Sequence, residues 1–370
     1  MTSTSFQKTP FYFKFAMILL MLGLICLLLY YGQDIIIPFA LSILLAIVLT
    51  PVNNFLEKKK IPRVWAISIS LTFSLLIIVG ILYFISTQIM SFSEDLPVIR
   101  ERLTELFNKA QQWIAENLNL SRRDQAKYID TAKDSGTSAL GSTVISVTNA
   151  IFVLVLLPIY AFLVLYYRDM LKQFLVDVFQ PNHHENVKEV IKESRIVVQS
   201  YMVGLLIEMV IVAVINYIGF LIIGIKYAVF LAVFAAILNL LPYVGMLIAT
   251  VFCMLVTLAT SSNPADTLWT FAVLSIVQFI DNNIIMPKVV GSKVKINALI
   301  TILGVLIGGA LCGISGMFLS IPGIAILKVI FDRIDELKPW GMLLGDDITS
   351  NKPSKIFEKA NILRKKKASA

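Results

Sequence analysis

The sequence predicts an all-α, polytopic membrane protein, and three observations support this class. Hydrophobic residues make up 57% of the 370 residues and charged residues only 15%, whereas a soluble domain carries about 25% charged residues. The mean hydropathy is +0.81. Apolar runs of roughly 20 residues, the length of one membrane span, recur along the chain and are contiguous rather than alternating. We expect about eight transmembrane helices, an extramembrane helical insert and a C-terminal Gly-rich re-entrant helical hairpin.

Residues 1–89 are expected to form an N-terminal bundle of three spans. The spans lie at about 15–31, 35–55 and 64–89. Pro38 and Pro51 bound the second span. Segment 57–63 (EKKKIPR) holds four Lys/Arg and one Glu, and basic clusters beside apolar spans are typical of the cytoplasmic side. We therefore place this segment and the N-terminus in the cytoplasm.

Residues 90–141 are expected to form an extracytoplasmic amphipathic helical insert. They carry seven Lys/Arg and eight Asp/Glu, which is unlike a membrane span. Apolar residues recur between Leu96 and Ile114 at the 3–4 spacing of one helical face. Such helices could pack on each other or lie on the membrane surface. They could also form an oligomerisation surface or a gate over a transport path.

Residues 142–345 are expected to form a C-terminal transport bundle. Its five spans end near residues 167, 225, 241, 260 and 285. Between the first two of these spans, the charged residues 168–197 are predicted to form a cytoplasmic helix. Its apolar positions follow a helical face, and the helix is expected to run directly into the fifth span of the chain.

The apolar run 296–330 is expected to fold back on itself as a re-entrant hairpin. As one helix it would measure about 50 Å, too long for a hydrocarbon core of about 30 Å. The run carries six glycines, and four of them, Gly308, Gly309, Gly313 and Gly316, offer a bend. Residues 352–367 hold seven Lys/Arg and one Glu, so the basic tail 346–370 is placed in the cytoplasm. The run must then enter and leave the membrane on one side; a single tilted helix is the alternative.

The segment QFIDNNIIMPKVVG at 278–291 is the most informative part of the chain. Pro287 and Gly291 are expected to break the helix just after a polar cluster that closes an apolar run. The cluster consists of Gln278, Asp281, Asn282 and Asn283. An aspartate at mid-membrane costs roughly 2.5–3.5 kcal/mol, so Asp281 is predicted to bind a proton or, transiently, Na⁺, with help from neighbouring amide oxygens. The alternative is a structural group that pairs with Lys288 or caps the hairpin.

Glu208 is the second candidate for this site. It lies midway through the fifth span, and nothing nearby in the sequence neutralises it, so its partner must come from another helix or from water. Asn216 follows on a similar face of the same helix. We predict a place in the permeation path for both residues; a structural polar contact between helices is the alternative.

Helix breaks offer candidate hinges. Asn239, Pro242 and Gly245 could form an unwound elbow whose carbonyls bind a polar substrate, or a tight turn at the cytoplasmic surface. Small residues also recur four apart in the glycine-rich run. These pairs are Gly304 with Gly308 and Gly309 with Gly313. Such pairs are typical of close helix packing, and the same positions could serve as the hinge of a moving hairpin.

Several other chemistries find no support in the sequence. The chain has neither a GxxxxGK[ST] phosphate loop nor an HExxH motif. The two histidines, His183 and His184, are adjacent and do not face one ligand on a helix. The cysteines, Cys26, Cys253 and Cys312, all lie in apolar runs. We therefore expect no enzyme activity, no cofactor, no structural metal and no nucleic-acid partner.

Four segments together resemble the autoinducer-2 exporter family of bacterial membrane proteins. They are PFALSILLAIVLTP at 38–51, NLLPYVG at 239–245, QFIDNNIIMPKVVG at 278–291 and SIPGIAILK at 320–328. The resemblance covers almost the whole chain, including the charged insert. It implies a permease of the bacterial inner membrane that exports autoinducer-2 or acts as a sodium/proton antiporter. It also implies a homo-oligomer, which could be a pentamer.

The function predicted from the sequence is secondary transport. The chain is expected to export a small polar solute such as autoinducer-2, or to exchange Na⁺ for H⁺, with the lipid bilayer as its surroundings and both termini in the cytoplasm. A channel-like pore is one alternative. A non-transporting membrane scaffold that acts through the helices of 90–141 is the other.

Overall fold

The computed structural model describes residues 10–118, 155–242, 244–289 and 296–346, and these residues form helices and turns without a β-strand. Five helices among them are long and apolar enough to cross a membrane. They are Phe15–Lys58, Arg63–Glu94, Pro181–Ile223, Ala265–Val289 and Ala298–Arg333. Shorter apolar helices accompany them. The predicted class, an all-α polytopic membrane protein, is confirmed.

The first helix differs from the prediction. α1 (Phe11–Lys58) is one helix of 48 residues, whereas the sequence predicts two spans with a break between residues 31 and 35. Gly32 lies inside the helix, and so does Pro38. A proline removes one backbone hydrogen bond and can kink a helix without ending it. Gly32 and Asp34 are favoured in turns but are tolerated inside a helix, and the chain stays helical through both.

The outer faces of α1 and α2 (Arg63–Glu94) are apolar. Leu28 on α1 is 65% exposed and Phe73 on α2 is 62% exposed. Exposed side chains of this kind suit lipid rather than water, because lipid tails are as apolar as leucine. These surfaces face the bilayer.

The second half of α1, the first half of α2 and the helix Val155–Tyr166 share a buried core. Its members are Ala46, Leu49, Ile67, Leu71, Ala161 and Leu165. The Ser42 hydroxyl adds a link, because it donates to the Leu157 carbonyl at 3.1 Å. The helix Val155–Tyr166 thus packs beside the N-terminal helices; the rest of the predicted fourth span lies outside the described residues.

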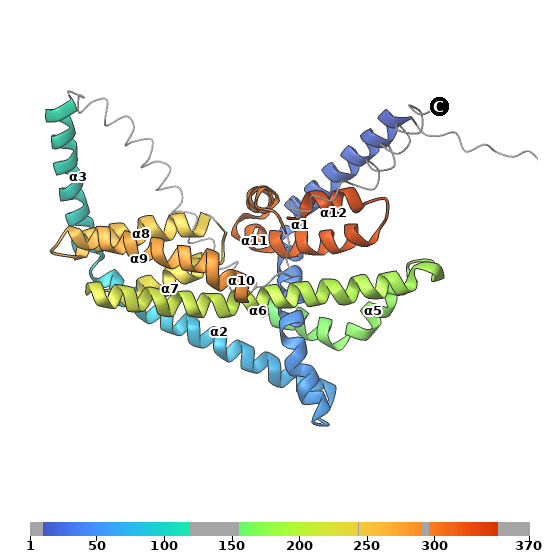
Figure 1. Cartoon of the computed structure of the whole chain (residues 1–370). Helices are drawn as coiled ribbons and strands as arrows, with labels where there is room; N and C mark the ends of the chain where they lie inside the picture. The colour runs from blue at the N-terminus through green and yellow to red at the C-terminus, as the bar shows by residue number, and fades with distance from the viewer. Residues whose placement is uncertain (1–9, 119–154, 243, 290–295, 347–370) are drawn as a thin grey trace, which may run out of the picture.

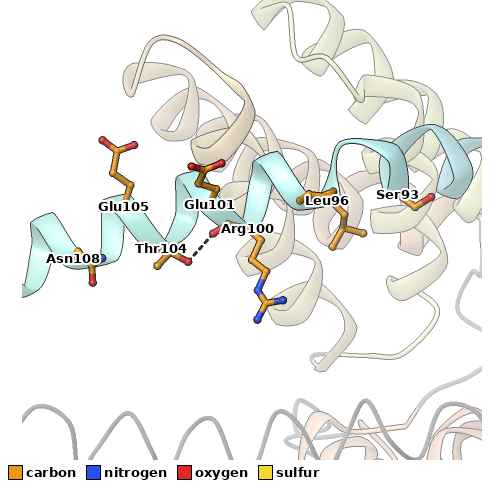
Figure 2. Close-up of a pocket in the computed structure, with 8 residues that line it drawn as sticks. Ser93, Leu96, Arg100, Glu101, Thr104, Glu105 and Asn108 are labelled. Carbon is orange, nitrogen blue, oxygen red and sulfur yellow. Dashed lines mark hydrogen bonds between the residues drawn. The ribbon is translucent and has the colours of Figure 1, made fainter.

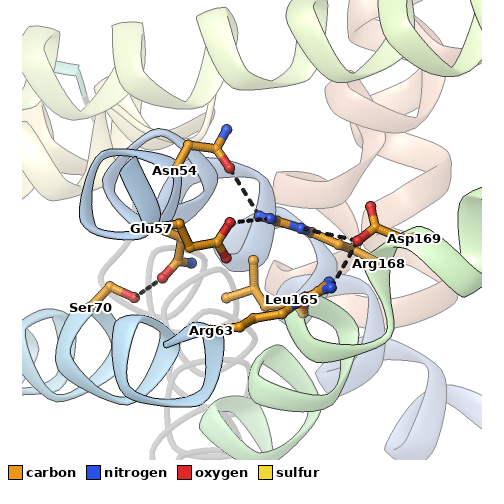
Figure 3. A network of polar contacts seen from close by, with 8 residues as sticks. Asn54, Glu57, Arg63, Ser70, Leu165, Arg168 and Asp169 are labelled. Carbon is orange, nitrogen blue, oxygen red and sulfur yellow. Dashed lines mark hydrogen bonds and ion pairs between the residues drawn. The ribbon is translucent and has the colours of Figure 1, made fainter. Parts of the chain in front are cut away.

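A polar network joins the end of α1, the start of α2 and the start of α5 (Arg168–Asp177), as Figure 3 shows. Arg168 donates to the Glu57 carboxylate at 2.6 Å, and Arg63 donates to the Asp169 carboxylate at 2.8 Å. Arg63 also donates to the Leu165 carbonyl at 2.9 Å. The hydrogen bonds of these two arginines therefore connect the basic turn between α1 and α2 to α5.

The insert begins with α3 (Leu96–Leu118), which projects from the rest of the molecule at the upper left of Figure 1. Its first turns pack on the bundle through Ile99 and Leu103. Just before α3, Phe92 stacks on Phe230, with ring centroids 5.2 Å apart. The Asp95 carboxylate accepts hydrogen bonds from Lys226 and Tyr227. α3 packs on α8; the rest of the predicted insert, residues 119–141, lies outside the described residues.

We expect neutralisation of Asp95 to loosen the base of α3. The hydrogen bond from Lys226 holds the pKa of Asp95 below its ordinary value of 3.8, and Asp95 raises the pKa of Lys226 above 10.5. The contact therefore stabilises the fold above the ordinary pKa of aspartate and is lost as the pH falls through the lowered folded pKa. On the alkaline side it is lost as the pH rises through the raised pKa of Lys226.

Hydrogen–deuterium exchange on the purified protein measures this anchor. At neutral pH, Asp95→Asn should reduce the amide protection of residues 96–104, whereas the matched acid-to-amide change Glu101→Gln on the same helix should leave it unaltered. In the wild type, protection should be level from about pH 5 to about pH 9. Equal protection in Asp95→Asn and wild type would show that Asp95 does not anchor α3.

The charged segment after the fourth span is divided into two helices. The sequence predicts one helix over 168–197, but α5 ends at Asp177, a short 3₁₀ helix (η1, Pro181–His183) follows, and α6 (His184–Ile223) then begins. Pro181 separates the two because it starts a new helical turn and cannot continue one. The second part of the prediction is confirmed, since α6 runs from the charged segment into the fifth span without a break.

Two helices pack along the C-terminal half of α6 (Figure 1): α7 (Ala228–Leu238) and α9 (Ala265–Ile280). α8 (Val244–Thr260) packs on both α7 and α9. Small buried residues such as Ala232 and Ala249 let these helices approach closely. α7 has 11 residues and spans only about 17 Å, so the predicted sixth span is too short to cross a hydrocarbon core of about 30 Å.

The glycine-rich run forms a helical hairpin, as predicted. α11 (Ala298–Arg333) turns back at Cys312 and Gly313, which have non-helical backbone angles. Gly313 has φ 60° and ψ −147°, a region that almost only glycine occupies. The two arms touch where Gly308 faces Gly316, and a Cβ on either would overlap the carbonyl of the other. Its insertion into a membrane from one side stays a prediction.

The open end of the hairpin is tied to its neighbours. The Asn297 side chain accepts from the Ile300 amide at 2.8 Å and donates to the Leu343 carbonyl at 2.7 Å, which joins the first arm to α12 (Lys338–Leu344). At the end of the second arm, Arg333 donates to Glu189 and Glu193 on α6. The hairpin is thus held at its base while its bend points away from these contacts.

Candidate functional site

Glu208 lies in the interior of the molecule. It is on the α6 face that also carries Leu205 and Val212, and only 5% of it is exposed. The sequence predicts that its partner must come from another helix or from water. The structure supplies a partner from the end of another helix, because the Asn239 side-chain nitrogen donates to Glu208 Oε1 at 3.3 Å.

Asp281 reaches the same place from the end of α9. It is 2% exposed and begins a π-helical turn (η2, Asp281–Ile285), which α10 (Met286–Val289) follows. A π-helical turn inside an α-helix often marks a functional site. Pro287 accounts for this turn in part, because it has no N–H and its ring crowds the carbonyl four residues earlier, at Asn283. The predicted break therefore takes the form of a widened turn upstream of Pro287.

Asn239 bridges the two carboxylates. Its side-chain nitrogen donates to Asp281 Oδ2 at 2.9 Å as well as to Glu208. Asn239 is the first residue after α7, in the tight turn to α8. Three elements distant in sequence, α6, the α7–α8 turn and η2, thus bring their polar groups to one point inside the bundle.

The charge on this pair has no basic partner. In the part of the chain that the structure describes, no ion pair involves Glu208 or Asp281. The second oxygens, Glu208 Oε2 and Asp281 Oδ1, are buried without a hydrogen-bond partner among the described residues. The alternative in which Asp281 pairs with Lys288 is therefore not what the structure shows. Two buried carboxylates beside each other repel, so a proton or a cation must balance them.

The other members of the predicted cluster lie differently. Asn282 and Asn283 are exposed, and Asn283 donates to the Phe279 carbonyl at 2.8 Å. Gln278 donates to Asn282 at 3.1 Å. Gln278 also lines a small cavity with Asn216 and Asn239. The structure thus brings Gln278 and Asn216 to the neighbourhood of the carboxylate pair and turns Asn282 and Asn283 away.

The predicted hinge residues also differ in where the structure places them. Pro242 lies in the turn between α7 and α8, and a Cβ on Gly245 would overlap the Leu238 carbonyl, so the elbow is a tight turn. This turn positions Asn239 for the site. Gly291 lies outside the described residues. In the hairpin, Gly304 contacts Ile324 and Gly309 contacts Met317, as close packing requires.

A larger open hollow lies elsewhere, along α3 (Figure 2). Its volume is about 740 Å³, and its lining residues all lie between Ser93 and Asn108. Figure 2 shows Glu101 and Glu105 on one side of the helix and Arg100 on the other. Because the lining comes from one continuous stretch of chain, the last turn of α2 and the first turns of α3, no groups distant in sequence converge there. The carboxylate pair is therefore the better candidate site.

Two features of the site are missing from the sequence prediction. The sequence assigns Asn239 only to an elbow, and its role as the bridge between the carboxylates depends on how α7 packs against α6. The π-helical turn is also unpredicted. A proline six residues after an aspartate is the one signal that could have indicated a distorted turn at this position.

Comparison with known proteins adds independent evidence. Residues 15–336 match the family described as "AI-2E family transporter". "Putative transport protein YueF" of Bacillus subtilis (strain 168) is 28% identical over 323 residues, which cover 81% of this chain and 84% of that protein. "Putative permease PerM" of Escherichia coli (strain K12) is 27% identical over 320 residues, covering 82% and 88%. "AI-2 transport protein TqsA" of the same strain is 22% identical over 338 residues, covering 89% and 95%.

Proposed function

Because the chain belongs to the AI-2E family of transporters, we propose that it is a proton-coupled secondary transporter of the bacterial inner membrane. Glu208 and Asp281, bridged by Asn239, are its coupling site. The cargo is a small polar solute such as autoinducer-2, or Na⁺ in exchange for H⁺. The name of the relative TqsA, an AI-2 transport protein, supports the first cargo, and the oxygen-rich site supports the second.

The observation that carries this proposal is the shared amide donor. One nitrogen, Asn239 Nδ2, lies within hydrogen-bond distance of both buried carboxylates. Two carboxyl groups so placed hold a proton between them readily, as in other buried acid pairs. Removing that proton leaves a charge that a cation or a cargo group must balance. The pair can therefore exchange a proton for a positively charged or hydrogen-bond-donating ligand.

The hairpin is the proposed moving part. Val305 and Ile321 of α11 pack on Leu205, one turn before Glu208 on α6. A shift of the hairpin against α6 would change the packing around Glu208 and so its access to either side of the membrane. We place both termini and the basic turn 57–63 in the cytoplasm, and we propose a homo-oligomer.

Transport in proteoliposomes tests the function. Vesicles with an imposed pH gradient and an internal pH dye receive Na⁺, Li⁺ or K⁺, and parallel vesicles are loaded with autoinducer-2 to follow efflux. A cation-triggered pH change supports exchange, and proton-coupled efflux supports solute export. Flux that is indifferent to the pH gradient would instead indicate a channel-like pore. Absence of any flux would favour a membrane scaffold.

A further inference from the structure

A second polar feature lies next to the carboxylate pair. It is a cavity of about 20 Å³ between α6, α7, α8 and α9. A volume of roughly 10–15 Å³ already admits one water molecule or an ion of similar size. The polar side chains that line it are Asn216, Asn239, Thr250 and Gln278. Four helices thus bring three amides and a hydroxyl around a space for one small particle.

Asn216 shows that the cavity needs an occupant. Its side chain is 2% exposed and lines the cavity, and its Oδ1 atom has no hydrogen-bond partner among the described residues. A buried amide oxygen left without a partner costs roughly 1–3 kcal/mol. The atom that satisfies it must therefore be a donor or a cation inside the cavity.

The charge of the surroundings favours a cation over water. Asn239 lines the cavity and at the same time donates to Glu208 and Asp281, so one side chain separates the cavity from two carboxylates. A water molecule would satisfy Asn216 but would leave the negative charge of the pair uncompensated. Neutral amide and hydroxyl oxygens are the ligands that hard cations prefer, and nearby carboxylates supply the balancing charge.

We propose that this cavity is a binding site for one dehydrated alkali cation of the size of Na⁺ or Li⁺, with ligands from Asn216, Asn239, Thr250 and Gln278. The site is separate from the position of Asp281 itself. The inference rests on the proposed function, because the ionised carboxylate pair supplies its counter-charge. In this proposal the cation and the Glu208–Asp281 pair lie on opposite sides of Asn239.

Thermal unfolding of the purified full-length protein in detergent tests the site independently of transport. Melting temperatures are compared at one pH and equal ionic strength in NaCl, LiCl, KCl and choline chloride. We expect Na⁺ or Li⁺ to raise the melting temperature by a few degrees over choline, with a saturable dependence on concentration, because a ligand that binds only the folded state stabilises it.

Two substitutions locate the effect. Ala249→Val fills the cavity without removing a polar group, and Asn216→Leu removes the unpartnered oxygen; both should lose the cation-specific rise. Ala259→Val enlarges another buried alanine of α8 that does not line the cavity, so it should keep the rise even if its basal melting temperature falls. Asp281→Asn removes part of the counter-charge and should weaken the rise.

Two results would overturn the inference. One is a wild type whose melting temperature is the same in all four salts, which would mean that the cavity holds water. The other is an undiminished rise in Ala249→Val, which would place the cation elsewhere. Neither result touches the proposed function if Asp281→Asn still abolishes proton-coupled flux in vesicles. Conversely, proton-coupled flux that survives the loss of both carboxylates contradicts the proposed function, whichever salt raises the melting temperature.

Discussion

Asp281→Asn should reduce proton-coupled flux in proteoliposomes to the level of protein-free vesicles. Asparagine has nearly the same shape, so it keeps a side-chain oxygen that can accept from Asn239, but it cannot release or take up a proton. Glu208→Gln should behave in the same way for the same reason. Loss of a titrating group at a coupling site removes the step itself, so we expect a fall of about a hundredfold or more, the lower end for general acid–base groups.

The matched control is Asn283→Ala. Asn283 lies two residues from Asp281 in sequence, but it is exposed and its side chain donates to the Phe279 carbonyl on the same helix. It should transport at the wild-type rate. Normal flux in both Asp281→Asn and Glu208→Gln would contradict the proposed mechanism. Loss of flux in one variant alone would assign the transported proton to the carboxylate changed in that variant.

Gly316→Val should strongly destabilise the hairpin. The new side chain would overlap the Gly308 carbonyl, and because backbone faces it there, no rotamer change relieves the clash. Overpacking of this kind typically costs 1–3 kcal/mol, and we expect about 3 kcal/mol or more here. Melting temperature in detergent and the fraction of monodisperse protein on size-exclusion chromatography would report it.

Gly323→Val is the control for this change. Gly323 lies on the same arm, and nothing approaches its Cβ position within 4 Å. A valine there adds bulk only toward the surroundings, and valine has a better helix propensity than glycine, so stability should be equal or slightly higher. If Gly316→Val proves as stable as Gly323→Val, the two arms do not pack through Gly308 and Gly316.

Much of the fold could be predicted because its signals are local. The apolar runs indicate the helices, and the glycines between 308 and 316 indicate a bend in α11. The structure places this bend at Gly313, whose backbone angles few other residues adopt. The fusion of two predicted spans into α1 could not be predicted in this way. Gly32 is compatible with both a turn and a helix, and the choice between them depends on packing against helices elsewhere in the chain.

The site was predictable in its charged members and not in its assembly. Glu208 and Asp281 are conspicuous because each is an acid in an apolar run. Their meeting through Asn239 depends on tertiary packing of α6, α7 and η2. Asn282 and Asn283 were expected at the site because they adjoin Asp281, but neighbouring residues on a helix point in different directions, and these two point outward.

The π-helical turn Asp281–Ile285 also determines the direction in which the side chains after it point. In an α-helix each residue turns the direction of its side chain by about 100°, and a turn closed by i→i+5 bonds holds one residue more than an α-helical turn. The helix after Ile285 is therefore rotated about its axis, relative to α9, by about the angle that one extra residue adds. The number of residues between Asp281 and Pro287 then matters as much as their identity. A deletion of one residue in this turn would restore regular winding and swing either the aspartate or the helix that follows it out of its present direction.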